Sequence, residues 1–132
     1  MKTTVADKWF SRYIRLRAAD SDGTGTCVTC GRVGLVKHMD CGHYIKRQHT
    51  AARFSPINCQ LQCKRCNSFE QGADVKFRAY LVETYGEEKI QLLESSKRST
   101  AKRGKMEMEW LANEYRELTN YLLKEKGLQK WW

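Results

Sequence analysis

Several features that mark membrane, secreted or disordered proteins are missing from this sequence. No apolar run approaches the roughly 20 residues that a helix needs to cross a bilayer. The N-terminal segment is polar and charged, so we expect no secretory signal and a reducing, cytoplasmic setting. Proline occurs once, at Pro56, and neither a repeat nor a low-complexity tract is present. With 132 residues, 41% of them hydrophobic, the chain can form one folded domain.

Acidic residues are scarce relative to basic ones. Lys and Arg number 24 against 15 Asp and Glu, which gives a net charge of +9. The excess is concentrated in short segments, among them 32–53 and 97–105, and the first overlaps the motifs described below. Such clustering favours a polyanionic partner, with DNA as the first candidate, although a solvated surface is the alternative for any single run. The basic residues predicted to contact phosphate are Arg12, Arg15, Arg47, Arg53, Lys102 and Arg103.

Hydrophobic periodicity predicts a mainly helical chain around a short central region. Apolar residues recur at helical spacing near both ends, and Gly86 and Gly127 stand where helices should end. Short β-like pieces lie between the cysteines, at 34–39 and 43–45. The expected helices span 4–18, 74–85, 87–95 and 105–126, with a further one that begins at Cys66 or Asn67 and breaks at Gly72.

The last of these helices carries an apolar seam that two arrangements would explain. Packing onto the helix's own domain is one interpretation, and a contact between two copies of the chain is the other. Two heptads do not decide between them, because a coiled-coil assignment needs three or four. The residues of the seam step by three and four positions: Met108, Leu111, Tyr115, Leu118 and Leu122.

The six cysteines indicate a metal site. In a basic chain of a reducing compartment, cysteines more often bind metal than form disulfides. Two C-x-x-C pairs are present, and each can place two thiolates on one ion, which predicts a tetrahedral structural zinc site. Cys41 and Cys59 are left over, either as small buried hydrophobic residues or as auxiliary ligands. The four predicted zinc ligands are Cys27, Cys30, Cys63 and Cys66.

Between the cysteine pairs begins a pattern that resembles the HNH endonucleases of the ββα-metal class. It consists of His43, then Asn58, then Asn67 directly behind the last cysteine. A neutral histidine, with a reference pKa of about 6.5, suits the general base that deprotonates the attacking water in phosphodiester hydrolysis. Asn67 can offer its side-chain oxygen to a divalent ion that polarises the phosphate. The resemblance implies that Asn58 orients the base and its loop.

The predicted ligand set departs from many HNH motifs, which place an acidic residue or a histidine directly before the base. Gly42 occupies that position here. Asp40 lies two positions further back, on the same side of a strand as Gly42, and could take over ligation of the catalytic ion. His49 is a second candidate ligand, whereas His38 is expected at the surface. Magnesium and manganese both suit such oxygen ligands.

A closer resemblance is to the phage NinG (also called Rap) recombination protein family, over about residues 7–94. The Asp-x-Gly-His form is itself a feature of this family. The resemblance implies an endonuclease that cuts Holliday junctions and other branched DNA in the cytoplasm of a phage-infected host. The motifs that carry it are Phe10-Ser11-Arg12-Tyr13-Ile14-Arg15-Leu16-Arg17, Cys27-Val28-Thr29-Cys30-Gly31, Asp40-x-Gly42-His43-Tyr44-Ile45-x-Arg47, Thr50-x-x-Arg53-Phe54-x-x-x-Asn58, Gln62-Cys63-x-x-Cys66-Asn67, Gly72 and Tyr85-Gly86.

Together these features predict an α+β fold, with a small zinc-stapled ββα-metal (HNH-like) core flanked by N-terminal and C-terminal helices. Residues 1–96 would form the nuclease domain. Residues 97–132 would form a basic loop and an amphipathic helix that belongs to the same domain or makes a homodimer. Two alternatives to the branched-DNA endonuclease remain open. One is a non-catalytic zinc-stapled DNA-binding module, and the other is an HNH nuclease without structural preference.

Overall fold

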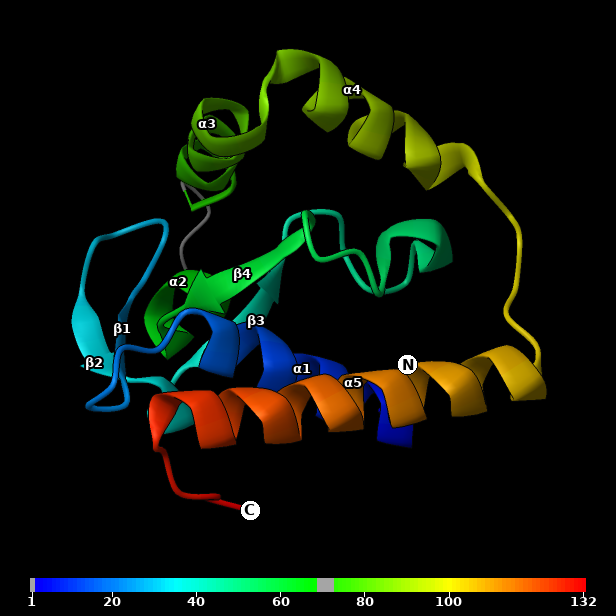
Figure 1. The fold of residues 1–132 in the computed structure, drawn as a ribbon. Coiled ribbons are helices and arrows are strands. Elements are labelled where there is room, and N and C mark those ends of the chain that lie inside the picture. Colours follow the sequence, from blue (N-terminus) through cyan, green and yellow to red (C-terminus); the bar gives the residue numbers. More distant parts are fainter. Residues whose placement is uncertain (1, 69–72) are drawn as a thin grey trace.

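The computed structural model describes residues 2–68 and 73–132, which combine helices with two small sheets (Figure 1). Each sheet is an antiparallel hairpin: β1 (Thr24–Thr26) pairs with β2 (Val33–Leu35), and β3 (Asp40–His43) with β4 (Cys59–Gln62). The α+β class is therefore confirmed. None of the described helices is long and apolar enough to cross a membrane. The helices are α1 (Val5–Arg17), α2 (Lys64–Ser68), α3 (Ala73–Tyr85), α4 (Glu87–Ser95) and α5 (Lys105–Lys126), with 3-10 turns at Val36–His38, Thr50–Ala52 and Ser96–Arg98.

The β3–β4 hairpin and α2 form a ββα unit at the centre of the molecule. Asp40 pairs with Gln62 at one end of the hairpin, and His43 pairs with Cys59 at the other. A single residue separates β4 from α2, so the helix turns back beside the strands (Figure 1). This order is the one that the sequence predicted for the core.

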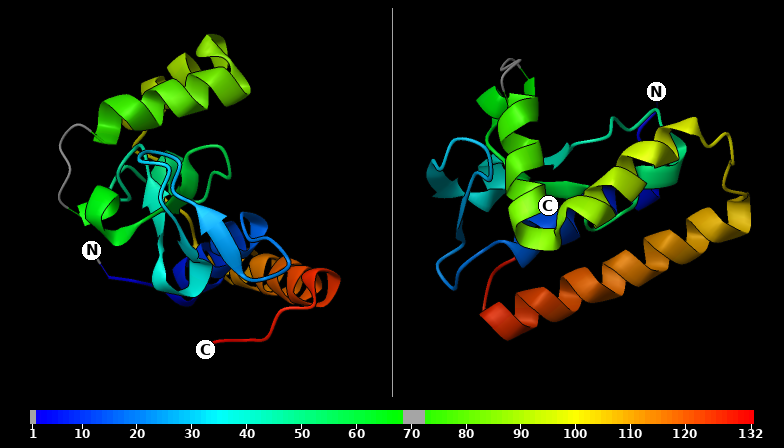
Figure 2. Two further views of the ribbon diagram at one scale, coloured as in Figure 1. Left: turned by 90° about the vertical axis from the view of Figure 1, so that its left-hand side faces the viewer. Right: turned by 90° about the horizontal axis from the view of Figure 1, so that it is seen from above.

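α1 contacts the hairpin and α5, and it lies between them (Figure 2). The helix begins at a capping box: the Asp7 N–H donates to Thr4 Oγ1, and the Thr4 N–H donates to the Asp7 carboxylate. Phe10 and Ile14, one helical turn apart, are buried. The buried face of α1 therefore anchors the helix to the core, while its polar side chains remain available to line a pocket.

α5 runs along α1 and packs on it with the predicted seam. Leu111 and Tyr115 are buried against the N-terminal helix, and the Tyr115 ring lies 4.8 Å from that of Phe10, centre to centre. Met108 and Leu118 join the same cluster. The seam thus packs within one chain, which supports the first of the two arrangements considered above. A homodimer through this helix stays a prediction.

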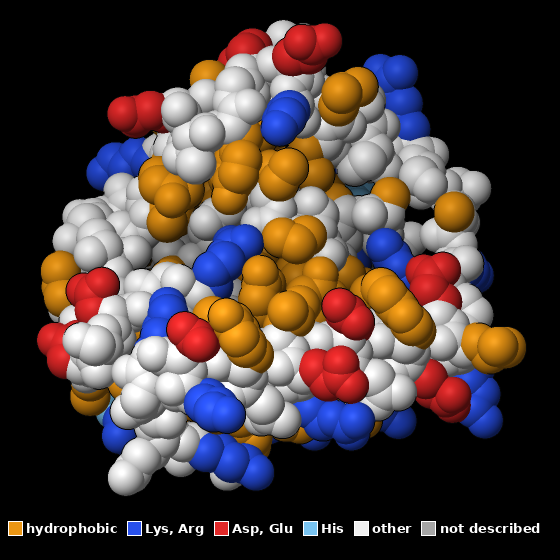
Figure 3. Space-filling model, viewed as in Figure 1, with side chains coloured by type: hydrophobic (Ala, Val, Ile, Leu, Met, Phe, Trp, Pro, Cys, Tyr) orange, Lys and Arg blue, Asp and Glu red, His pale blue; other side chains and the backbone are white. Residues whose placement is uncertain are grey.

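α3 and α4 form a further layer over the hairpin. Phe77, Leu81 and Ile90 make their shared buried cluster. Arg78 on α3 holds α4 through ion pairs with Glu87 and Glu94, at 2.7 and 2.8 Å. In the surface view, hydrophobic side chains are gathered in a band across the middle of the face, between this layer and α5 (Figure 3).

The predicted helices agree closely with the structure, whereas the β-like pieces do not. The strand residues are 33–35 and 40–43, because residues 36–38 turn into a 3-10 helix between them. α2 begins at Lys64, slightly earlier than the expected Cys66 or Asn67, so that the last C-x-x-C pair lies on the helix entrance. The predicted break at Gly72 lies outside the described residues.

Candidate active site and metal centre

The two C-x-x-C pairs meet at one end of the ββα unit. One pair lies in the connection between β1 and β2, and the other at the junction of β4 and α2. The four Sγ atoms all lie within 4.8 Å of one another. Cys30 Sγ and Cys63 Sγ are 3.7 Å apart, close to the roughly 3.8 Å between ligands of a tetrahedral zinc with Zn–S bonds of about 2.3 Å. The structure thus brings the four predicted zinc ligands together, and the donor set fits a structural zinc ion.

The thiols of this cluster have unequal pKa values. Burial raises the pKa of Cys27, but hydrogen bonds from Thr29 and from backbone N–H groups outweigh it and lower the pKa to about 6. Burial and hydrogen bonds to the other three thiols raise the pKa of Cys66 to about 12. Four thiolates at this spacing repel one another, so a divalent cation is what allows all of them to ionise.

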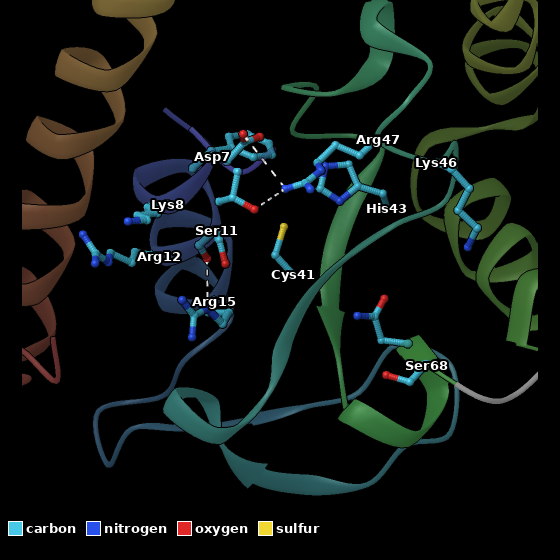
Figure 4. A pocket seen from close by; sticks show the side chains of 13 residues that line it. Asp7, Lys8, Ser11, Arg12, Arg15, Cys41, His43, Lys46, Arg47 and Ser68 are labelled. Carbon is cyan, nitrogen blue, oxygen red and sulfur yellow. Dashed lines mark hydrogen bonds and ion pairs between the residues drawn. The ribbon is translucent and has the colours of Figure 1, made fainter. Parts of the chain in front are cut away.

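A basic pocket with a volume of about 680 Å³ lies between α1, β3 and α2. Figure 4 shows Asp7, Ser11 and Arg15 on α1 along one side, with Cys41 and His43 of β3 across from them. Asp7 is the one acidic side chain among the described lining residues. The pocket is therefore suited to an anionic group such as phosphate. Its basic side chains are Lys8, Arg12, Arg15, Lys46 and Arg47.

His43 is half-buried in the wall of this pocket, at the end of β3. Its Nε2 lies 2.9 Å from the backbone oxygen of Arg53. A carbonyl only accepts hydrogen bonds, so Nε2 carries the proton and the neutral ring keeps Nδ1 as its acceptor. Burial lowers the pKa of His43 below its usual value, and the bond to the carbonyl offsets this only in part. The imidazole is therefore held in the state that a general base requires at neutral pH.

Asn58 is fully buried next to the loop that follows the histidine. Its Oδ1 accepts from the Ile45 N–H at 2.7 Å, and its Nδ2 donates to the carbonyls of Ile45 and Ala52 at 3.0 and 3.1 Å. The Asn58 amide thus connects the start of the loop after β3, at Ile45, to the 3-10 turn that ends at Ala52. Arg53 follows that turn, so Asn58 also supports the carbonyl that orients His43. This geometry fits the positioning role that the HNH resemblance implies.

Asp40 and Asn67 come together at the rim of the pocket region. Asn67 Nδ2 donates to Asp40 Oδ2 at 3.0 Å, and Lys64 Nζ donates to the other carboxylate oxygen at 2.9 Å. Asn67 also lines the basic pocket that contains His43. The structure therefore places the two predicted ligands of a catalytic ion side by side. His49 does not line this pocket, and His38 is exposed as expected.

Gly42 has a structural reason to lack a side chain. A Cβ at this position would lie 1.9 Å from Oε1 of Gln62, whose side chain is buried. The position directly before the base is thus closed to an acidic ligand by a neighbour on β4. The departure from the common HNH pattern follows from packing, and the nearest carboxylate on the strand is that of Asp40.

The predicted phosphate-contacting residues divide into two groups. Arg12, Arg15 and Arg47 line the basic pocket. Arg53 instead binds both oxygens of Asp7, and Arg103 donates to the Thr50 carbonyl and pairs with Glu107. Lys102 is exposed outside the pocket. The guanidinium groups of Arg53 and Arg103 are thus engaged in holding the fold.

Sequence reasoning missed Asp7 and the proximity of Cys41 and Cys59 to His43. Burial opposes ionisation of Asp7, but hydrogen bonds from Arg53 and Thr4 outweigh it and lower the pKa of this carboxyl. The Thr-x-x-Asp spacing of a capping box was a signal that α1 begins there. Cys41 is two residues before His43, a spacing that brings side chains to one face of a strand.

Comparison with known proteins supports the assignment of a family. The family model described as "Bacteriophage Lambda NinG protein" matches residues 3–125, which extends well beyond the 7–94 over which motifs were recognised. Proteins named "Protein ninG" from Escherichia phage 933W and Enterobacteria phage VT2-Sa are each 34% identical over 94 residues, 69% of this chain. The chain covers 43% of the length of each relative, and no solved structure matches it. The chain therefore belongs to the bacteriophage lambda NinG protein family.

Proposed function

We propose that this protein is a metal-dependent DNA endonuclease that hydrolyses phosphodiester bonds in branched recombination intermediates such as Holliday junctions. The observation that carries the proposal is His43, which faces a basic pocket with its Nε2 tied to the Arg53 carbonyl. A neutral imidazole oriented in this way is suited to accept a proton from a water molecule at Nδ1. Membership of the NinG family supports DNA recombination as the setting.

The residues in and beside the pocket would divide the chemistry between them. Arg12, Arg15 and Arg47 attract and orient the phosphate, and His43 takes the proton of the attacking water. Asp40 and Asn67 would hold a magnesium or manganese ion through their side-chain oxygens, in place of the bonds that Asp40 now accepts from Asn67 Nδ2 and Lys64 Nζ. When bound, such an ion polarises the scissile phosphate and stabilises the charge on the leaving oxygen. Asn58 keeps the base in place without touching the substrate.

The preference for branched DNA rests on the family, whereas the positive charge supports only a nucleic-acid partner. The chain carries a net charge of +9, and the relatives with which it aligns are phage NinG proteins. We place its action in the cytoplasm of the infected host, where phage DNA recombines. Because two strands must be cut to resolve a junction, a homodimer through the C-terminal helix would suit this role.

The proposal is tested by cleavage of an end-labelled four-way junction and of a linear duplex with the same sequence. Wild-type protein should cut the junction preferentially, and only with magnesium or manganese. His43→Ala should lower the rate by about a hundredfold or more while junction binding, measured by fluorescence anisotropy, is retained. His38→Ala removes an exposed imidazole and serves as the matched control.

Three outcomes would contradict the proposal in different ways. Undiminished cutting by His43→Ala would remove this histidine as the base. Tight, salt-sensitive binding without cutting under any metal would make the protein a zinc-stapled DNA-binding module instead. Equal cutting of junction and duplex would leave a nuclease without structural preference.

A further inference from the structure

Three side chains of types that bind metal ions gather at the wall of the basic pocket, apart from the four-cysteine cluster. They are Cys41 and His43 on β3 and Cys59 on β4, and their ligand atoms all lie within 4.8 Å of one another. The register explains the cluster: Cys41 and His43 share one face of the strand, and Cys59 is the cross-strand partner of His43. All three side chains thus project from one small patch of the hairpin.

The cluster has the access and the donors that a metal site needs. Both thiols are free, Cys59 is buried, and Cys41 lines the open pocket beside His43. An ion can therefore reach the cluster from the pocket while one ligand stays shielded from water. Two thiolates and an imidazole are soft donors that favour zinc over magnesium or manganese. Three protein ligands would leave a fourth position open towards the pocket.

His43 makes the kind of ring hydrogen bond by which metal-binding histidines are usually oriented. Such histidines donate their second ring N–H to a carbonyl or carboxylate, which fixes the ring and its tautomer. His43 makes this bond through Nε2 to the Arg53 oxygen at 2.9 Å. The nitrogen left for an ion is Nδ1, the same atom that the proposed reaction needs as a base. Binding of an ion and acceptance of a proton at this atom exclude each other.

We propose that Cys41, His43 and Cys59 form a second zinc site, whose occupation switches the nuclease off. The binding itself depends only on the three side chains, and its inhibitory effect rests on the function proposed above. Magnesium and manganese, held by oxygen ligands, support cleavage. Zinc bound at the cysteine–histidine site occupies Nδ1 of His43, so that this nitrogen can no longer accept a proton from the attacking water. The rate of cleavage would thus depend on the ratio of zinc to magnesium or manganese ions.

The site is tested first without DNA, by zinc content at equilibrium in dialysis against buffered free zinc. Wild-type protein should hold two zinc ions per chain, one of them in the four-cysteine cluster. Cys41→Ala, Cys59→Ala and His43→Ala should each hold one, with affinity for the second lowered by roughly tenfold or more. His38→Ala should retain both. A single zinc in the wild type, or two in all three variants, would overturn the site.

Cleavage of the junction with magnesium then tests the consequence. Zinc should inhibit the wild type over the concentrations that fill the second site, and inhibition of Cys41→Ala should require roughly tenfold more zinc. Each variant is compared with its own rate in the absence of added zinc. Equal zinc sensitivity of the two proteins would overturn the switch. If no cleavage occurs at all, the proposed nuclease function fails, while the zinc content still decides whether the site exists.

Discussion

Asn58 shows how a single buried amide can determine the geometry of a loop. Its side chain satisfies one backbone N–H and two carbonyls in a region from which water is excluded. Without the amide, the Ile45 N–H and carbonyl would lose the bonds that Asn58 makes to them, whereas the Ala52 carbonyl would keep its bond from the Ser55 N–H. The residue is thus a structural requirement for the orientation of His43, although it does not face the pocket.

Asn58→Ala should therefore lower the free energy of unfolding by about 3 kcal/mol, because buried unpaired polar groups cost about 1–3 kcal/mol each. Urea denaturation followed by tryptophan fluorescence measures the change. Asn120→Ala, on the exposed side of α5, is the matched control and should have little effect. A loss below about 1 kcal/mol would mean that the loop does not depend on this amide.

Gly42 offers a second test at the scale of one residue. Gly42→Ala places a methyl group on the buried side chain of Gln62 and should cost about 1–3 kcal/mol. Gln62→Ala removes the obstacle, so the cost of Gly42→Ala should be smaller in that background than in the wild type. A double-mutant cycle by chemical denaturation measures this coupling. Additive effects would show that the two positions do not compete for space.

Part of the site could be predicted from residue types and spacing alone. The C-x-x-C pairs specify a metal cluster because each pair needs only a local turn, and the Asp40–Asn67 contact follows from the HNH resemblance. The role of Arg53 could not be predicted, because its pairing with Asp7 joins residues far apart in the sequence. Nothing local distinguishes such an arginine from one that contacts phosphate.

At the scale of elements, α3 and α4 are held together and to the hairpin by one polar cluster. Arg78 donates to both oxygens of Glu94 at 2.8 and 3.0 Å, and the hydroxyl of Tyr44 donates to the same carboxylate. These hydrogen bonds, with that from Arg78 as the largest cause, lower the pKa of Glu94 to about 2. Burial followed by the bond to Glu94 raises the pKa of Tyr44 to about 12.

This cluster predicts a specific dependence of stability on pH. Because the pKa of Glu94 is lower in the folded state than its usual 4.5, its contribution is complete above about pH 4.5. The contribution is lost as the pH falls from there towards about 2. Thermal unfolding at pH 7, 4 and 3 should show a smaller acid-induced drop for Glu94→Gln than for the wild type. Glu88→Gln is the exposed control, and an unchanged acid profile for Glu94→Gln would contradict this role.

The helices were predictable because their limits are encoded locally, whereas the strands were not. α5 ends at Gly127, where φ is 64°. A glycine in this position is a helix-ending signal that can be recognised from the sequence alone. The strands have only three or four residues each, too few for a clear alternation. The positions of the strands depend on contacts with the four-cysteine cluster and with α1. The residues of the strands alone do not reveal these contacts.

At the scale of the whole molecule, the four-cysteine cluster links three parts of the chain. It joins the β1–β2 connection, the end of β4 and the start of α2. Asn67 directly follows the last cysteine, so the four-cysteine cluster and the rim of the basic pocket share a helix. Structural zinc sites contribute directly to the free energy of folding in domains of this size.

Removal of zinc by a strong chelator should therefore unfold the region around the ββα unit and abolish DNA cleavage. Circular dichroism and zinc content measured on the same samples test this, together with Cys27→Ser, which should behave like the chelated protein. Cys41→Ala, outside the four-cysteine cluster, is the control that should keep the fold. A metal-free protein with an unchanged melting temperature would rule out a structural role for the ion.

The contact between Lys126 and the end of α1 has a consequence for the order in which the protein is made. Lys126 Nζ donates to the carbonyl oxygens of Leu16, Arg17 and Ala19, at 2.7–2.9 Å. The bonds from Lys126 to the end of α1 can form only after the last turn of α5 has left the ribosome. Since α1 forms one wall of the basic pocket, a growing chain would contain His43 and the four cysteines before α5 has packed against that wall. If the proposed nuclease function holds, cleavage would begin only after synthesis reaches α5.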